Sequence, residues 1–244
     1  MEILIWTALV GFILFLFYGI VPTVLFRTKS IGLIKRGPHR RSVALTFDDG
    51  PNPTYTPVLL DLLKQYNCKA TFFVVAQKAE KYPELVRRMV NEGHTIGIHH
   101  YTHTDSWFLS PFATRQEILD STRVIERVSG VKPRFYRPPF GRLNIFTYMF
   151  AKDYDIVLWS SIFQDWKKQD HEKLKSKMMD GLEEGAIFLL HDDGANPKAD
   201  SDAPDTTIKA LSRFIPEALS IGYECVNLDA HLQEKSAMEQ KRIL

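Results

Sequence analysis

Apolar residues recur along the chain in short blocks, and helical patterns separate these blocks from one another. Seven β-branched and apolar runs predict strands, near residues 42–47, 70–75, 95–98, 135–136, 156–159, 186–190 and 224–227. Opening prolines, closing glycines and helical apolar spacing predict helices near residues 57–66, 83–92, 111–128, 144–152, 171–182 and 206–219. This alternation favours the α/β class, with about seven strand–helix units forming a closed or nearly closed parallel barrel.

The N-terminal segment follows a different pattern. Residues 3–26 contain no charge and are rich in Leu, Ile, Phe and Val. At 1.5 Å per residue this segment is long enough to cross a hydrocarbon core of roughly 30 Å. One alternative is a buried core helix, but that helix would need polar residues on its water-facing side, and this segment has almost none. The other is a cleaved signal peptide, which would need a basic segment before the apolar run, and only Met1 and Glu2 precede it. We therefore expect one retained transmembrane helix in residues 1–26, bent near Pro22, that places residues 3–26 in a lipid bilayer.

Charge is distributed unevenly after this segment. Residues 27–41 hold six basic side chains, and no acidic residue occurs between Glu2 and Asp48, so we expect a basic linker there. The positive-inside rule would place the following domain in the cytoplasm, although the same charges could also lie on anionic headgroups. We expect the main domain over residues 42–228, and over residues 229–244 a short surface helix or a frayed tail.

Composition narrows the class of protein further. The chain has 244 residues, of which 45% are hydrophobic, 25% charged and 12% aromatic, and this excludes a disordered or collagen-like chain. The chain has 31 basic and 29 acidic residues. Six of the basic residues and one of the acidic residues precede Ser42, so the main domain has a net charge of −3. No nucleic-acid partner is therefore expected. Cys68 and Cys225 cannot form a disulfide framework and are expected to be buried thiols.

Polar side chains follow several of the predicted strands directly. Because the loops after parallel barrel strands open on one face, where active sites are built, these side chains are expected to converge. They are Asp48 and Asp49 after the first strand, His99, His100 and His103 after the third, Arg137 after the fourth, Asp165 beyond the fifth and His191 at the end of the sixth.

Two imidazoles and one carboxylate of this set can form a three-ligand site for a divalent metal. His99 and His103 are four residues apart, so one helical turn would bring both rings to the same side, with Asp49 as third ligand. Asp48 is better placed as a base beside the metal, because adjacent side chains diverge. Solvated turn histidines are the alternative, and His100 could compete with His99 as a ligand.

Five short motifs resemble those of the polysaccharide deacetylases, the NodB-like domains of carbohydrate esterase family 4. They occur in family order between Ser42 and Leu228. The motifs are Thr46-Phe47-Asp48-Asp49-Gly50-Pro51, His99-His100-Tyr101-Thr102-His103, Arg137-Pro138-Pro139-Phe140-Gly141, Asp165-Trp166 and Leu189-Leu190-His191.

The resemblance implies a distorted (β/α) barrel and metal-assisted hydrolysis of an N-acetyl or O-acetyl group on a sugar. It implies a divalent metal, commonly zinc, with Co, Ni, Mn or Fe also possible. The implied roles are metal binding by Asp49, His99 and His103, proton acceptance by Asp48, proton donation by His191, positioning by Arg137 and Asp165, and substrate binding by Phe140, Trp166 and Leu189. General acid–base chemistry suits this division, because an amine leaves poorly unless it is protonated.

The sequence departs from the family pattern at four positions. His100 replaces Ser or Thr, Ile98 replaces Asn, Phe140 replaces Tyr, and Ile162 replaces an acidic residue. The resemblance implies that the Phe140 position binds the oxyanion through its backbone N–H, which the loss of the hydroxyl leaves intact. The resemblance implies that the acidic residue at the position of Ile162 helps to hold Arg137, and isoleucine does not provide this support.

The resulting hypothesis is a membrane-anchored deacetylase of an N-acetylhexosamine glycan, with peptidoglycan, another surface polymer or a lipid-linked sugar as substrate. A lipid-linked sugar suits a cytoplasmic domain, whereas the polymers suit the outside, where many family members work. The alternatives are an O-acetyl esterase and a non-catalytic sugar-binding module. Trp107 and Phe108 could stack on sugar, touch the membrane or be buried, and residues 192–205 are expected to form a loop beside His191.

Overall fold

Nine parallel strands form the centre of the structure, a computed structural model that describes residues 1–38 and 40–233. Their order is β1-β6-β5-β4-β3-β2-β8-β7, and β9 pairs with β2. The strands are β1 (Leu33–Ile34), β2 (Ser42–Asp48), β3 (Thr71–Val74), β4 (Thr95–Ile98), β5 (Phe135–Tyr136), β6 (Asp155–Val157), β7 (Ser161–Ile162), β8 (Ala186–His191) and β9 (Glu224–Val226).

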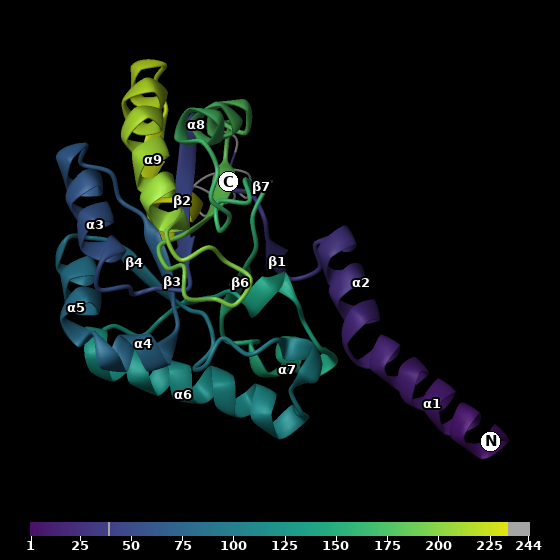
Figure 1. Ribbon diagram of the computed structural model, residues 1–244. Coiled ribbons are helices and arrows are strands. Elements are labelled where there is room, and N and C mark those ends of the chain that lie inside the picture. Colours follow the sequence, from purple (N-terminus) through teal and green to yellow (C-terminus); the bar gives the residue numbers. More distant parts are fainter. Residues whose placement is uncertain (39, 234–244) are drawn as a thin grey trace, which may run out of the picture.

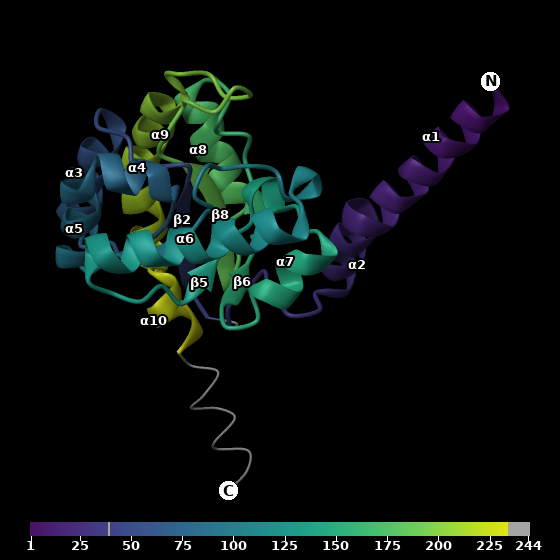
Figure 2. The ribbon, with the colours of Figure 1, turned by 90° about the horizontal axis from the view of Figure 1, so that it is seen from below.

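Helices surround the outer side of these strands (Figures 1 and 2). The connections between parallel strands run through them, as parallel pairing requires. The helices of the domain are α3 (Tyr55–Gln65), α4 (Ala76–Lys81), α5 (Pro83–Asn91), α6 (Pro111–Ser129), α7 (Ile145–Phe150), α8 (His171–Asp180), α9 (Ala203–Ser220) and α10 (Leu228–Leu232), with 3₁₀ turns η2 (Ser106–Phe108) and η3 (Pro139–Gly141).

The predicted α/β barrel of parallel strand–helix units is confirmed. It is an open, distorted barrel, because β1 and β7 end the strand order and no pairing joins them within residues 1–38 and 40–233. The sequence pattern does not predict the two-residue strands β1 and β7, although it does predict β5, which is equally short. Strand β1 lies within the segment expected as a linker and pairs with β6.

The core is built around β2, which pairs with β3, β8 and β9 and is buried along its whole length. Phe47 of β2 stacks on Phe72 of β3, with ring centroids 5.3 Å apart. Truncation of such a buried aromatic ring costs about 3–5 kcal/mol of unfolding free energy. Strand β2 therefore holds the residues at its C-terminal end in a rigid position.

The N-terminal helix runs without interruption through α1 (Glu2–Phe15), a π-helical turn η1 (Leu16–Ile20) and α2 (Val21–Lys29), and projects away from the domain (Figure 1). Over its most apolar window its mean hydropathy is 2.4, and 6% of that window is buried. It is the one helix in the described part of the chain that is long and apolar enough to cross a membrane. The π-helical turn directly precedes the region of Pro22, which has no N–H for the helix ladder.

The described residues at the C-terminus form a short helix. Residues 228–232 form the short helix α10, in which Leu228 and His231 are buried. His231 contacts the Ser42 hydroxyl at 3.1 Å and the Gly185 carbonyl at 3.1 Å, so α10 packs against the domain. Residues 234–244 of the expected tail lie outside the described residues.

Candidate active site

A cavity of about 230 Å³ opens where the C-terminal ends of the strands meet. Eight of the ten candidate residues line it, and the remaining two, Arg137 and Asp165, are buried behind its wall. The eight are Asp48, Asp49, His99, His103, Phe140, Trp166, Leu189 and His191. The ends of β2 and β8, the loops after β2, β4 and β5 and the segment after β7 thus bring together side chains more than 140 residues apart.

Three of these side chains form a compact set of possible metal ligands. One ligand atom from each of Asp49, His99 and His103 lies within 4.8 Å of the other two. Asp49 Oδ1 is 2.9 Å from His103 Nε2 and 3.3 Å from His99 Nε2. Ligands of a tetrahedral zinc ion lie about 3.3–3.6 Å from one another, so the spacing is close to what an ion requires.

The surroundings of the three side chains also fit a divalent cation. The Nδ1 atom of His99 lies 2.8 Å from the Arg137 carbonyl oxygen, which makes Nδ1 the donor and leaves Nε2 free to coordinate. Asp49 Oδ1 is buried and accepts no well-aligned hydrogen bond among the described residues. Burial raises the pKa of Asp49, but contacts with His103 and His99 hold it well below its usual range, so the carboxylate is ionised. Two imidazoles and one carboxylate suit zinc or a similar ion.

Backbone conformation, rather than a helix, brings the ligands together. The expectation that one helical turn aligns His99 and His103 is wrong, because residues 99–105 form an irregular loop. His100 and His103 adopt φ of 63° and 62°, and Asp49 adopts 76°. Non-glycine residues rarely occupy this left-handed region, and such positions concentrate at functional sites.

His100 lies outside the set of ligands. Its Nδ1 atom lies 2.8 Å from the Thr104 carbonyl oxygen, and its Nε2 atom lies 2.7 Å from the Tyr136 hydroxyl. The ring is fully buried and stacks on Tyr136, and burial lowers the pKa of His100 to about 3. Both ring nitrogens are therefore occupied, and the ring remains neutral, so His100 does not compete with His99.

Asp48 is held by a buried arginine. Arg137 Nη1 donates to Asp48 Oδ1 at 2.7 Å, while Asp48 Oδ2 lies 3.7 Å from His99 Nε2, on the cavity side. The guanidinium is fully buried and also donates to the Val157 and Leu158 carbonyls and to the Thr46 hydroxyl. These hydrogen bonds fix the position of the Arg137 guanidinium, and the guanidinium in turn fixes the Oδ1 atom of Asp48.

His191, at the end of β8 and next to Asp48 in the strand register, is held by Asp165. His191 Nδ1 lies 2.8 Å from Asp165 Oδ1, and the edge of the Trp166 indole faces the imidazole at 5.4 Å between ring centroids. Burial alone would lower the pKa of His191, but the charge and hydrogen bond of Asp165 raise it to about 9. The imidazole is therefore protonated at neutral pH, with Nε2 directed away from Asp165.

Several cavity residues are absent from the sequence analysis. Trp159 lines the wall, and so do three residues of the loop after β8, among them Lys198, whose ammonium lies 5.0 Å from the centre of the Phe140 ring. Ile162, already noted as a departure from the family pattern, lines it as well. Trp159 follows β6 by two residues, so the rule that selected Arg137 could have selected it. Lys198 carries no such signal, since its contact depends on the path of the 11-residue loop between β8 and α9.

Asp192, which directly follows His191 at the end of β8, is a buried carboxyl group. It accepts a hydrogen bond from the Thr56 hydroxyl at 2.5 Å, and has its Oδ1 atom without a partner among the described residues. Burial raises the pKa of Asp192 to about 7, and the nearby Asp193 adds to the shift. Asp193 itself pairs with Lys78 at 3.0 Å.

Comparison with known proteins agrees with this architecture. A family model described as Polysaccharide deacetylase matches residues 35–159, just over half of the chain. The protein belongs to the polysaccharide deacetylase family, whose members are hydrolases that act on carbon–nitrogen bonds other than peptide bonds. The resemblance stated from the motifs is therefore confirmed at the level of the family.

Named relatives cover most of the chain. It is 34% identical over 200 residues to a peptidoglycan-N-acetylglucosamine deacetylase of Bacillus cereus, which covers 81% of this chain and 70% of the relative. It is 38% identical over 192 residues to a chitooligosaccharide deacetylase of a Bradyrhizobium species, across 75% of this chain and 87% of the relative. A crystal structure of a peptidoglycan N-acetylglucosamine deacetylase in complex with 4-naphthalen-1-yl-N-oxidanyl-benzamide superposes with a TM-score of 0.77 at 32% identity, over 85% of this chain and 96% of that one.

Proposed function

We propose that the protein is a membrane-anchored, metal-dependent hydrolase that removes N-acetyl groups from N-acetylhexosamine-containing glycans and releases acetate. The observation that carries this proposal is that the compact set Asp49, His99 and His103 lines the same cavity as Asp48 and His191. Relatives named as peptidoglycan N-acetylglucosamine and chitooligosaccharide deacetylases support an N-acetylated sugar as the substrate. The apolar N-terminal helix supports the membrane anchor.

Asp49, His99 and His103 would hold the divalent ion, for which zinc is the first candidate. Bound there, the ion would polarise the acetyl carbonyl and make the attacking water more acidic. The chain's own contribution is the fixed geometry of the ligands, since His99 is oriented by the Arg137 carbonyl and Asp49 by its left-handed backbone. This preorganisation avoids a reorganisation cost during the reaction.

Asp48 would take the proton from the attacking water. Arg137 occupies one of its oxygens at 2.7 Å, and the other oxygen lies on the cavity side near His99. The buried guanidinium of Arg137 holds its oxygen of Asp48 in place, so the other oxygen is left to face the cavity. Arg137 makes no contact with the cavity and is therefore a positioning residue.

His191 would protonate the departing amine. With a pKa raised to about 9, its imidazole carries a proton at neutral pH, and Asp165 on Nδ1 orients Nε2 as the donor. Trp166 and Leu189 line the same wall and would enclose the acetyl group together with Phe140. A positioned acid of this kind typically contributes about 10²–10⁴-fold to the rate.

The second candidate is an O-acetyl esterase, because the same cavity could activate water toward an ester. An alkoxide leaves more readily than an amine, so an ester substrate depends less on a proton donor. The Asp165–His191 pair, with its raised pKa, favours the amide substrate. A sugar-binding module without activity would need neither a complete ligand set nor Asp48, and both are present.

The test offers the full-length protein a panel of GlcNAc oligomers, peptidoglycan fragments and GlcNAc-lipids, with and without a chelator, and measures acetate and free amine together. Equal amounts of acetate and amine are expected, with loss of both in chelator. Asp48→Asn should lose activity, whereas Asp120→Asn, a partly exposed residue of α6 that pairs with Arg123, should retain it. Acetate release without new amine would indicate the esterase, and an active Asp48→Asn variant would exclude the proposed base.

A further inference from the structure

Five large apolar side chains stand exposed on the face of the domain that adjoins the N-terminal helix. They belong to η2, the first turn of α6 and α7, and Phe108 and Phe112 are 74% and 68% exposed. The five, which we call the apolar face, are Phe108, Phe112, Ile145, Tyr148 and Met149. Exposed apolar groups of this size and proximity mark an interaction site rather than an ordinary surface.

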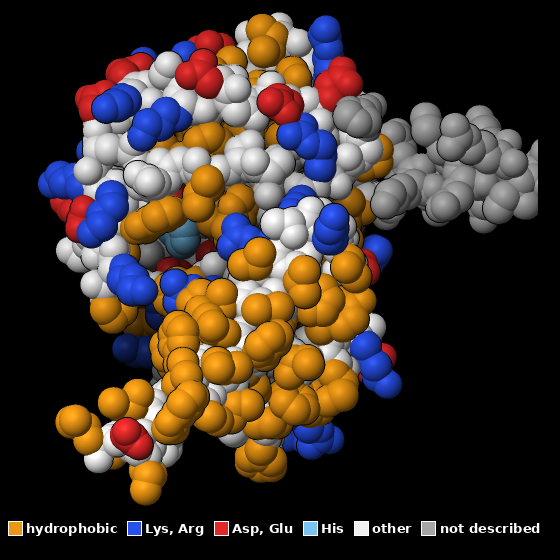
Figure 3. All heavy atoms as spheres, turned by 90° about the vertical axis from the view of Figure 1, so that its right-hand side faces the viewer, with side chains coloured by type: hydrophobic (Ala, Val, Ile, Leu, Met, Phe, Trp, Pro, Cys, Tyr) orange, Lys and Arg blue, Asp and Glu red, His pale blue; other side chains and the backbone are white. Residues whose placement is uncertain are grey.

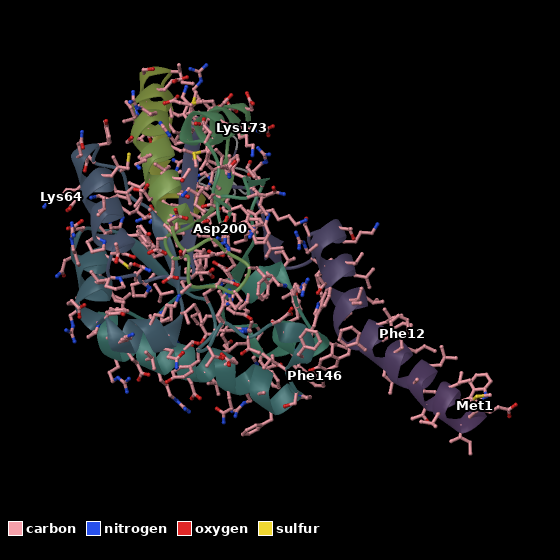
Figure 4. All side chains as sticks on the ribbon, viewed as in Figure 1. Met1, Phe12, Lys64, Phe146, Lys173 and Asp200 are labelled. Carbon is pink, nitrogen blue, oxygen red and sulfur yellow. The ribbon has the colours of Figure 1, made fainter. Side chains whose placement is uncertain are left out.

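The second half of the N-terminal helix packs along this same face. Figure 4 shows Phe146 of α7 beside the helix, whereas Phe12 and Met1 lie farther out along it. The aromatic pairs are Phe15 with Phe108, Tyr18 with Phe146 and Phe26 with Tyr148, at centroid distances of 5.8, 6.1 and 4.7 Å.

Hydrogen bonds fix this arrangement. The Thr23 hydroxyl donates to the Leu143 carbonyl at 2.7 Å and accepts from the Trp107 indole N–H and the Leu143 backbone N–H, both at 2.9 Å. Gly19 allows the close approach, because a Cβ there would lie 2.9 Å from the Trp107 ring. The helix and the apolar face therefore form one unit.

The length of the free part of the helix determines how deep this unit lies in a membrane. Helix α1 has 14 residues, about 21 Å of helix, which is less than a hydrocarbon core of roughly 30 Å. A bilayer around the helix must therefore extend past Phe15 into the segment that touches the domain. At that depth lie Phe108, opposite Phe15, and Phe146, opposite Tyr18.

We propose that the apolar face rests on the lipid bilayer and inserts its exposed side chains among the lipids beside the membrane helix. The proposal rests on the membrane anchoring proposed above and extends it to residues of the catalytic domain itself. Burial of these side chains in lipid removes apolar surface from water. Arg27 and Lys29 in the last turn of α2 suit the adjoining anionic headgroups.

This placement brings the cavity close to the membrane surface. Figure 3 shows hydrophobic side chains gathered along the helix side of the domain, and beside them a hollow in which a histidine is visible. The Arg27 guanidinium, at the end of the helix, lies 5.3 Å from the centre of the Trp159 ring, which lines the cavity. Docking of the apolar face would hold the mouth of the cavity beside the headgroups, where a glycan carried on a lipid is presented.

The test uses the full-length chain in vesicles of phosphatidylcholine and phosphatidylglycerol. Phe112→Cys and Met149→Cys are labelled with an environment-sensitive fluorophore, and Val58→Cys on α3, on the far side of the domain in Figure 1, is the matched control. Cys68 and Cys225 are buried, and the labelled unsubstituted protein gives their background. Quenching by lipids with a spin label in the upper acyl chain should be severalfold stronger at positions 112 and 149 than at 58.

Equal quenching at all three positions would overturn the proposal. Quenching at positions 112 and 149 that depends on the amount of protein in the vesicles would also overturn it, because a second copy of the chain would then cover the face. Resistance of the protein to alkaline extraction reports on the anchor separately, and acetate release reports on the proposed activity. Neither of these measurements depends on the docking of the apolar face.

Discussion

His191 and Asp165 form two contacts with each other across 26 residues of sequence. The imidazole Nδ1 lies 2.8 Å from Asp165 Oδ1, and the backbone N–H of His191 donates to Asp165 Oδ2 at 2.7 Å. The Thr207 hydroxyl adds a third, longer hydrogen bond to Asp165 at 3.3 Å. The carboxylate thus fixes both the orientation and the protonation of the imidazole.

Replacement of Asp165 by Asn should shift the pH dependence of activity. Asp165 raises the pKa of His191 to about 9, and the proposed proton donor is lost as the pH rises through that value. In Asp165→Asn the pKa falls, so the alkaline limb of kcat should move to lower pH and kcat at neutral pH should fall by about 10²–10⁴-fold. Rates between pH 5 and 10 on an acetamido sugar measure both effects. An unmoved alkaline limb would show that His191 is not the donor.

Replacement of Arg137 by Lys should damage both stability and turnover. A lysine has no planar fork with which to reach Asp48 and the Val157 and Leu158 carbonyls at once, and it leaves buried polar groups unpaired. The expected loss is about 3–5 kcal/mol of unfolding free energy. Urea unfolding measures this loss, and kcat measured below the unfolding transition reports the misplacement of Asp48. A variant with wild-type stability would contradict the buried contacts of Arg137.

Asp192 should make the metal-free protein less stable as the pH rises. Its pKa is about 7 in the folded state against an ordinary value of 3.8, so the folded state binds more protons between these values. The folded state therefore loses stability from about pH 4 to pH 7, and the penalty is complete above pH 7. Asp192→Asn should remove about 2–4 kcal/mol of this penalty at pH 8 and little at pH 4. Thermal melts of chelator-treated protein at both pH values test this difference.

Thr23 should matter more than a threonine elsewhere on the same helix. Thr23→Val leaves the Trp107 indole N–H and the Leu143 backbone groups without their partner, at a cost of about 1–3 kcal/mol. Thr28 bonds only to carbonyls of its own helix, so Thr28→Val is the matched control. Melting temperatures in detergent should separate the two variants. Equal melting temperatures would indicate that the helix does not pack on the domain in this way.

Local patterns are sufficient to predict the main strands, most of the helices between them and the face on which polar residues meet, but not the short helix α4. Asp48, Asp49 and His99 could be selected because each stands at the end of an apolar run, and the parallel arrangement determines where that end lies. For the candidate ligand His103 the sequence suggests the wrong geometry, since a loop with left-handed backbone rather than a helical turn brings it to Asp49.

Contacts between distant segments left no trace in the sequence. The link from Thr23 to Leu143 spans 120 residues, and that from Thr23 to Trp107 spans 84, so no local periodicity could reveal the packing of the helix on the domain. The hydrogen bond at His100 Nε2 also depends on Tyr136, which lies on β5, whereas His100 lies in the loop after β4. Side-chain partners of this kind are set by tertiary packing, which a short sequence window does not contain.

The metal content of the purified protein tests the central claim most directly. Elemental analysis after dialysis against zinc should find about one ion per chain in the wild type and in Asp48→Asn, because Asp48 is proposed as the base rather than a ligand. The same value is expected for His100→Phe, since both ring nitrogens of His100 are engaged elsewhere. His103→Ala and Asp49→Asn should lose the ion. Full zinc occupancy in His103→Ala or Asp49→Asn, or no bound zinc in the wild type, would contradict the account.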